Sequence, residues 1–253
     1  MKKSFFAVLA AITLLAGNAV GQLVGDLDDL NYWGSGTNRI ALVIQWNDSK
    51  SPGSLAWGYR WSGTQTVGDM LTYLAANDSG LFLRIDSSTG FGMGIFGIGY
   101  QTGASPFGVT GAEDTGGSPV TPTFTAGIND LNTNPASTQA PASSAAASPT
   151  NAADRYAEGW NDTGFWELYN SGSDNSQLQS SFALPTTWTA SFVGSSTALV
   201  DGSWAAFSFA PGFASAGVAS SVTAAVPEPG SLGLLGFAAG AFWIWKRRRS
   251  PRG

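Results

Sequence analysis

The stretch that decides the fold reads Ile40-Ala-Leu-Val-Ile-Gln-Trp46, Asn47-Asp-Ser-Lys-Ser-Pro-Gly-Ser54, then Leu55-Ala-Trp-Gly-Tyr-Arg-Trp61. The first run is apolar and rich in β-branched residues, and the third alternates large apolar residues with others, as β-strands do. The residues between them are typical of a turn. This stretch therefore predicts a β-hairpin, around which we expect the rest of the chain to fold.

The second predicted strand carries an aromatic stripe, because side chains two residues apart share one face of a strand. The stripe consists of Leu55, Trp57, Tyr59 and Trp61. Two interpretations remain open: Trp57, Tyr59 and Trp61 could form a platform on which sugar rings stack, or they could be buried against a helix. Burial is the commoner outcome for large aromatic side chains.

A helix is predicted directly after the hairpin, from Thr66 to about Ala76. Thr66-Val-Gly-Asp69 has the form of a capping box with aspartate in place of glutamate. Apolar residues then recur at helical spacing, at Val67, Met70, Leu71 and Leu74. Asn77-Asp-Ser-Gly80 should end the helix, and Leu81-Phe-Leu-Arg-Ile85 should form the next strand.

Three aromatic segments near residues 164–169, 187–193 and 202–209 should complete the sheet. Between them and the first strands, residues 102–153 are rich in Pro, Ser, Thr and Ala, which predicts a disordered insert within one domain. The expected fold class is α+β, a mainly antiparallel β-sheet with one covering helix. The exported domain should span residues 22–225.

The composition excludes several kinds of chemistry. The chain has no histidine and no cysteine, so it has no disulfide, no Ser-His-Asp triad and no usual zinc site. All seventeen acidic residues lie between Asp26 and Glu228, with only five basic residues, giving this stretch a formal charge of −12. We therefore expect no nucleic-acid partner, no metal and no cofactor.

Two partial motifs have simpler explanations. The acidic start at Asp26, Asp28 and Asp29 could offer ligands to calcium, but it lacks the EF-hand pattern, so a solvated segment is favoured. Gly92-Met-Gly94-Ile-Phe-Gly97 matches the dinucleotide fingerprint, but turn-like residues follow where a helix should begin. Glycines in a strand that permit a close approach explain this run better.

An enzymatic alternative would rest on carboxylates. A glycosidase needs two acids roughly 5 to 9.5 Å apart in a cleft, and the candidates are Glu113, Glu158 and Glu167. Nothing in their spacing along the chain shows such a pair. We therefore expect no catalytic residues.

The two ends of the chain resemble targeting segments. Lys2 and Lys3 precede an apolar run and small residues, which predicts a signal peptide over residues 1–21. Cleavage is expected after Ala19 or after Gly21. The Sec export machinery is the expected partner for export. At the other end, Val226-Pro-Glu-Pro-Gly230 precedes an uncharged segment, residues 231–245, and a basic tail, residues 246–253. The uncharged segment of 15 residues would extend roughly 22 Å as a helix, short for a permanent span, and the basic tail should stay in the cytoplasm.

This order of Pro-Glu-Pro, short apolar helix and basic cluster resembles the PEP-CTERM sorting signal of exopolysaccharide-producing Gram-negative bacteria. The resemblance implies that Pro227, Glu228 and Pro229 are recognised by an exosortase, a membrane transpeptidase that removes the tail. It further implies a transient inner-membrane anchor followed by release to the cell surface or the medium. A stable single-pass anchor is the alternative.

The body has weaker resemblances. Residues 41–48, 55–61 and 201–204 resemble an uncharacterised body found with this sorting tail, and residues 63–71 and 164–170 loosely resemble the transcobalamin-like C-terminal module. We therefore predict a non-enzymatic surface or extracellular-matrix protein associated with exopolysaccharide. The alternatives are a module that binds a small ligand or glycan and a carboxylate-based glycosidase.

Overall fold

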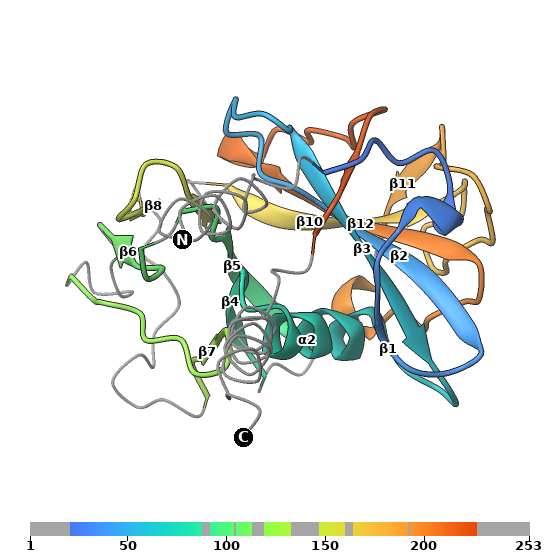
Figure 1. The fold of residues 1–253 in the computed structure, drawn as a ribbon, viewed down its shortest axis with the longest axis horizontal. Coiled ribbons are helices and arrows are strands. Elements are labelled where there is room, and N and C mark those ends of the chain that lie inside the picture. The colour runs from blue at the N-terminus through green and yellow to red at the C-terminus, as the bar shows by residue number, and fades with distance from the viewer. Residues whose placement is uncertain are drawn as a thin grey trace, which may run out of the picture.

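The computed structural model describes the greater part of the predicted exported body. The described residues are 21–87, 92–103, 105–112, 119–132, 147–159, 164–191 and 193–226. Two main β-sheets and one α-helix make up this part of the chain. Figure 1 shows the first sheet on the right, the second sheet in green to its left, and helix α2 below them.

The first sheet has seven strands, in the order β1-β3-β2-β12-β10-β11, with β13 pairing with β3 beside β1. Their bounds are β1 Tyr32–Gly34, β2 Asn38–Gln45, β3 Ser54–Trp61, β10 Phe165–Ser171, β11 Trp188–Ala190, β12 Ser203–Ala210 and β13 Thr223–Ala224. The predicted hairpin is confirmed, since β2 and β3 pair antiparallel from Asn38 opposite Trp61 to Gln45 opposite Ser54. The three later aromatic segments complete this sheet, as expected.

The sheet is mixed rather than mainly antiparallel as predicted. β12 lies parallel to β2, and the two short strands β1 and β13 lie parallel to β3. β12 can run parallel to β2 because the chain leaves the first sheet after β3, forms the second sheet, and returns. The sequence of the hairpin alone does not indicate that the chain leaves the first sheet and later returns to it.

A second sheet, which the sequence did not predict, takes the order β7-β4-β5-β9. Its strands are β4 Leu81–Asp86, β5 Gly94–Tyr100, β7 Ile128–Asp130 and β9 Arg155–Glu158. The strand expected after the helix is therefore real, but it belongs to this second sheet. Two further short strands, β6 Val109–Thr110 and β8 Ser148–Pro149, pair with each other, and three short 3-10 helices lie at η1 Leu27–Asp29, η4 Gly194–Ser196 and η5 Pro211–Phe213.

The predicted disorder of residues 102–153 is wrong for the parts that the structure describes, which include β6, β7 and β8. Phe107, Val109 and Phe124 bury apolar surface with Tyr156 on the outer face of the second sheet, which stabilises these segments. The two ends of the insert are also joined, because the Asp154 carboxylate accepts from the backbone N–H groups of Thr102 and Gly103 at 2.8 and 2.9 Å. Residues 133–146, the purest part of the insert, lie outside the described residues.

The predicted helix is confirmed as α2 Val67–Asn77, with Thr66 as its N-cap. Both hydrogen bonds of the capping box are present, since Asp69 N donates to the Thr66 side chain and the Asp69 carboxylate accepts from Thr66 N. Met70, Leu71 and Leu74 are fully buried. They join the main core cluster, which lies between the two sheets.

The strand β5 explains the glycine-rich run. A Cβ atom on Gly97 would lie 2.4 Å from the Tyr156 hydroxyl oxygen, and one on Gly99 would lie 2.4 Å from the Phe107 ring. Glycine is required because aromatic rings lie directly on the strand. Gly94 and Gly97 lie within β5, which agrees with the strand interpretation of this motif.

A buried ion pair also lies on the outer face of the second sheet. Arg84 Nη1 contacts Glu158 Oε1 at 2.5 Å, and the two side chains are 0% and 1% exposed. Among the residues that the structure describes, the Arg84 Nε and Nη2 groups have no hydrogen-bond partner. A second pair, Arg39 with Asp28 at 2.5 Å, is partly exposed, with side-chain exposures of 29% and 66%.

We predict that Arg84→Met lowers the free energy of unfolding by about 3–5 kcal/mol, because it leaves the Glu158 carboxylate buried without its partner. Arg39→Met, the matched change in the exposed pair, should cost less than about 1 kcal/mol. Urea denaturation followed by tryptophan fluorescence measures both. Arg84→Met combined with Glu158→Leu should recover much of the loss. Equal midpoints for the two single variants would contradict the prediction.

Candidate functional site

The C-terminal end of the described chain is built into the first sheet. β13 pairs parallel with β3, with Thr223 opposite Leu55 and Ala224 opposite Ala56. Ala225 N donates to Ala56 O at 2.7 Å, and the Asn31 side-chain amide donates to Ala225 O at 2.9 Å. The last residues of the body are therefore held by backbone hydrogen bonds on both sides.

The N-terminal end of the body holds the same segment from its other edge. Val24 N donates to Val222 O at 2.9 Å, and Ala224 N donates to Gln22 O at 2.8 Å. Leu23 forms an antiparallel bridge with Thr223. We call this arrangement of residues 22–24, residues 222–225 and the edge of β3 the terminal clamp. It places Gln22, the first residue of the mature chain if cleavage follows Gly21, beside Ala224.

The clamp also completes a hydrophobic cluster on the outer face of the first sheet. Val222, Ala224 and Ala225 are 1%, 3% and 1% exposed. Val222 and Ala224 pack with Val24 and Leu27 against side chains of β2, β3 and β12. Residues up to Ala225 are thus buried parts of the body, and the next residue, Val226, is half-buried.

The sorting residues Pro227, Glu228 and Pro229 and the predicted membrane segment, residues 231–245, lie outside the described residues. Four residues lie between Val226 and Ser231, so five steps along the chain at 3.3–3.6 Å each limit the distance between them to about 18 Å. Within the described ranges, no helix has the length and hydropathy needed to cross a membrane. The clamp therefore places the folded body directly beside the tail.

The aromatic stripe on β3 faces the core rather than solvent. Trp57 is fully buried, and Tyr59 and Trp61 are each 3% exposed. The Trp57 indole N–H donates to the Asp78 carboxylate at 2.6 Å, just after α2, and Tyr59 contacts Tyr73 of α2 with ring centroids 5.2 Å apart. Glycan stacking on these three side chains is not supported, because helix α2 and the second sheet cover the face that a sugar would need.

Glu158 and Glu167, the two candidate acids that the structure describes, do not form a catalytic pair. Glu158 Oε1 contacts Arg84 and Oε2 accepts from the Tyr156 hydroxyl on the outer face of the second sheet. Burial raises the pKa of Glu158, and the charge of Arg84 opposes this shift. Glu167 accepts from the Tyr169 hydroxyl at 2.5 Å, and Tyr169 belongs to the outer cluster of the first sheet.

The main core therefore lies between Glu158 and Glu167, which face opposite sides of the molecule. A shared cleft cannot include both carboxylates. Glu113, the third candidate acid, lies outside the described residues.

The acidic start forms a local structure of its own. Asp26 caps the 3-10 helix η1 Leu27–Asp29 with a complete capping box, and Leu27 is fully buried. The Asp29 carboxylate accepts from Gly25 N at 2.7 Å and Asp26 N at 3.2 Å. Asp28 contacts Arg39. Hydrogen bonds and this ion pair thus account for the three carboxylates, and the segment is an anchored cap rather than a freely solvated end.

The structure thus describes a β-rich body whose ordered C-terminal end is the terminal clamp. Residues 225–249 match the family described as the PEP-CTERM protein-sorting motif. The chain therefore carries this sorting motif, which implies an extracellular protein sorted by an exosortase and anchored in the membrane before processing. No curated protein and no solved structure matches the chain, so the resemblances proposed for the body stay predictions.

Sequence reasoning found the sorting motif but missed the clamp next to it. The run from Val222 to Ala225 is too short and too small to be recognised as a strand. Its only signal is that four apolar or β-branched residues directly precede the motif.

We predict that a chain ending at Val226 has the same stability as the full exported body. A chain ending at Ser220 should lose about 4 kcal/mol, because it lacks a buried valine and several backbone hydrogen bonds. The midpoints of urea denaturation of the two truncated chains measure this difference. If they were equal, the clamp would not contribute to the fold.

Proposed function

We propose that the protein is a non-enzymatic component of the cell surface or extracellular matrix, delivered there by exosortase processing and associated with exopolysaccharide. The exosortase would recognise Pro227, Glu228 and Pro229 while residues 231–245 hold the chain in the membrane. Removal of the tail then releases the folded body. The basic tail stays on the cytoplasmic side until that step.

The observation that supports this proposal most directly is the position of the motif relative to the clamp. Among the described residues, the last buried one is Ala225, and Pro-Glu-Pro begins two residues later, at Pro227. Cleavage beyond Val226 would leave every residue of the clamp in the released product. The body therefore does not need its tail in order to remain folded.

A non-enzymatic role agrees with how the body uses its polar side chains. Its candidate acids are engaged in ion pairs and hydrogen bonds on opposite faces, as described above for Glu158 and Glu167. The described residues also contain no group of three or more acidic side chains placed to hold a metal ion. Binding to a polymer requires neither a nucleophile nor a metal.

We predict that replacing Glu228 by Gln and Pro229 by Ala blocks processing in a host that has an exosortase. Intact-mass measurement of the purified protein should show a C-terminus near the motif for the natural chain. The variant should keep residues up to Gly253 and stay in the membrane fraction. Glu167→Gln, the same type of change in the body, should be processed normally.

A natural chain found in the periplasm with its tail intact, in a host with an active exosortase, would contradict the proposal. A product bearing an intact tail but firmly held in the inner membrane would instead support the alternative of a stable single-pass anchor.

A further inference from the structure

The body has very few cations that can meet an external ligand. Only five basic residues lie between Asp26 and Glu228, and the structure describes all five. Three are used internally: Lys50 donates to backbone carbonyl oxygens, Arg84 is fully buried, and Arg155 is 2% exposed. Arg39 and Arg60 are half-exposed, as Lys50 is, and they are the two basic residues that lie side by side.

These two arginines are direct neighbours on the outer face of the first sheet. Arg39 in β2 lies opposite Arg60 in β3 in the antiparallel register, a position in which Cβ atoms are about 4.5–5.5 Å apart and like charges repel. Arg39 is partly compensated by Asp28. Arg60 lies over the ring of Tyr32, with its guanidinium carbon 4.6 Å from the ring centroid. Among the described residues, no carboxylate pairs with Arg60.

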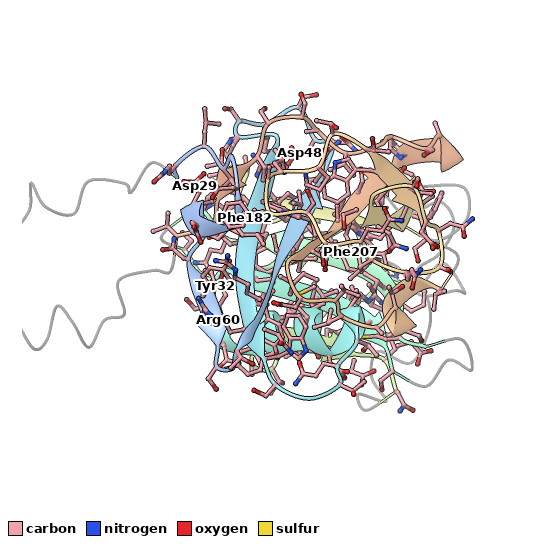
Figure 2. The ribbon with its side chains drawn as sticks, turned by 90° about the vertical axis from the view of Figure 1, so that its right-hand side faces the viewer. Asp29, Tyr32, Asp48, Arg60, Phe182 and Phe207 are labelled. Atoms are coloured by element: carbon pink, nitrogen blue, oxygen red, sulfur yellow. The ribbon has the colours of Figure 1, made fainter. Side chains whose placement is uncertain are left out.

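An exposed aromatic ring adjoins this pair. Phe182 is 49% exposed, and the Arg39 guanidinium carbon lies 5.2 Å from the centroid of its ring. Figure 2 shows Phe182, Tyr32 and Arg60 on one side of the molecule, over the first sheet. We call Tyr32, Arg39, Arg60 and Phe182 the arginine patch. It lies on the opposite face of β3 from the buried aromatic stripe.

We propose that the arginine patch binds the carboxylate groups of an acidic polysaccharide. A guanidinium matches a carboxylate in shape and can donate two parallel hydrogen bonds to it. The apolar face of a sugar ring can pack on Phe182, which is already exposed. This inference rests on the proposed association with exopolysaccharide and names its ligand class and binding residues.

Charge favours a flexible polymer over an anionic membrane as the partner. Asp28 contacts Arg39, and Asp29 follows in the same 3-10 helix. A flat anionic bilayer would bring many phosphates within the screening distance of about 8–10 Å from these carboxylates and be repelled. A polysaccharide chain is narrow and can leave the patch on either side of Arg60, so it places fewer anionic groups near Asp28 and Asp29 than a flat bilayer does.

The test uses the processed protein purified from its host and three probes: alginate as a polymer of uronic acids, dextran as a neutral polymer, and vesicles of phosphatidylcholine with phosphatidylglycerol. At about 0.15 M salt, where the repulsion between the −12 body and the polymer is screened beyond about 8 Å, the protein should bind alginate and not dextran. Arg60→Gln should lower the affinity for alginate about tenfold, the size expected for one charge-assisted hydrogen bond. Phe182→Ala, at an exposed position that should not affect folding, should lower it several-fold.

Lys50→Gln is the matched control, since it changes the net charge equally away from the patch and should leave alginate binding unchanged. Equal loss in Lys50→Gln and Arg60→Gln, or no loss in Arg60→Gln and Phe182→Ala, would overturn the assignment of the patch. Binding to vesicles instead of alginate would overturn the choice of ligand. Cell fractionation tests the proposed function separately: a sorted, extracellular protein that does not bind alginate refutes this inference alone.

Discussion

Burial of both faces of the first sheet is the constraint on which the structure depends, because the chain has no cysteine to crosslink it. The inner face packs against helix α2 and the second sheet. The outer face is covered by the two ends of the body, which meet in the terminal clamp. A sheet with one uncovered face would expose Val43 and Trp204, both fully buried here. Covering the outer face of the first sheet therefore requires both the first and the last residues of the body.

The local parts of this fold could be predicted from the sequence, because their signals are short-range. The hairpin, the capping box at Thr66 and Asp69, and the later aromatic strands all appear where periodicity and turn residues placed them. The parallel pairing of β12 with β2 and the second sheet could not be predicted, since they depend on contacts between residues 163 positions apart in the first case and 55 to 61 positions apart between β5 and β9. The insert was misjudged because Phe107 and Phe124 are isolated aromatic residues in a polar stretch.

For the candidate site too, local patterns could be predicted from the sequence, whereas long-range contacts could not. The sorting motif is an ordered local pattern, so the sequence suffices to find it. The aromatic stripe was correctly placed on one strand face, but periodicity cannot tell which face meets solvent. The structure resolves this by burying Trp57 and leaving Arg60 on the other face. The proposed arginine patch thus includes Arg60, on the face of β3 opposite the stripe, together with Tyr32, Arg39 and Phe182 from other parts of the chain, a combination that leaves little signal in the sequence.

The hydrogen bonds that join the two ends of the insert affect which changes of chain length the protein can tolerate. The Asp154 carboxylate accepts hydrogen bonds from the backbone of Thr102 and Gly103. The insert between Gly103 and Asp154 therefore begins and ends at one fixed point on the body. Lengthening such a loop costs only about 0.6 kcal/mol for each doubling. The chain between β7 and β8, which lies within this loop, could therefore gain or lose residues with little effect on the two sheets. The same position would accept an epitope tag or a small guest domain for display outside the cell.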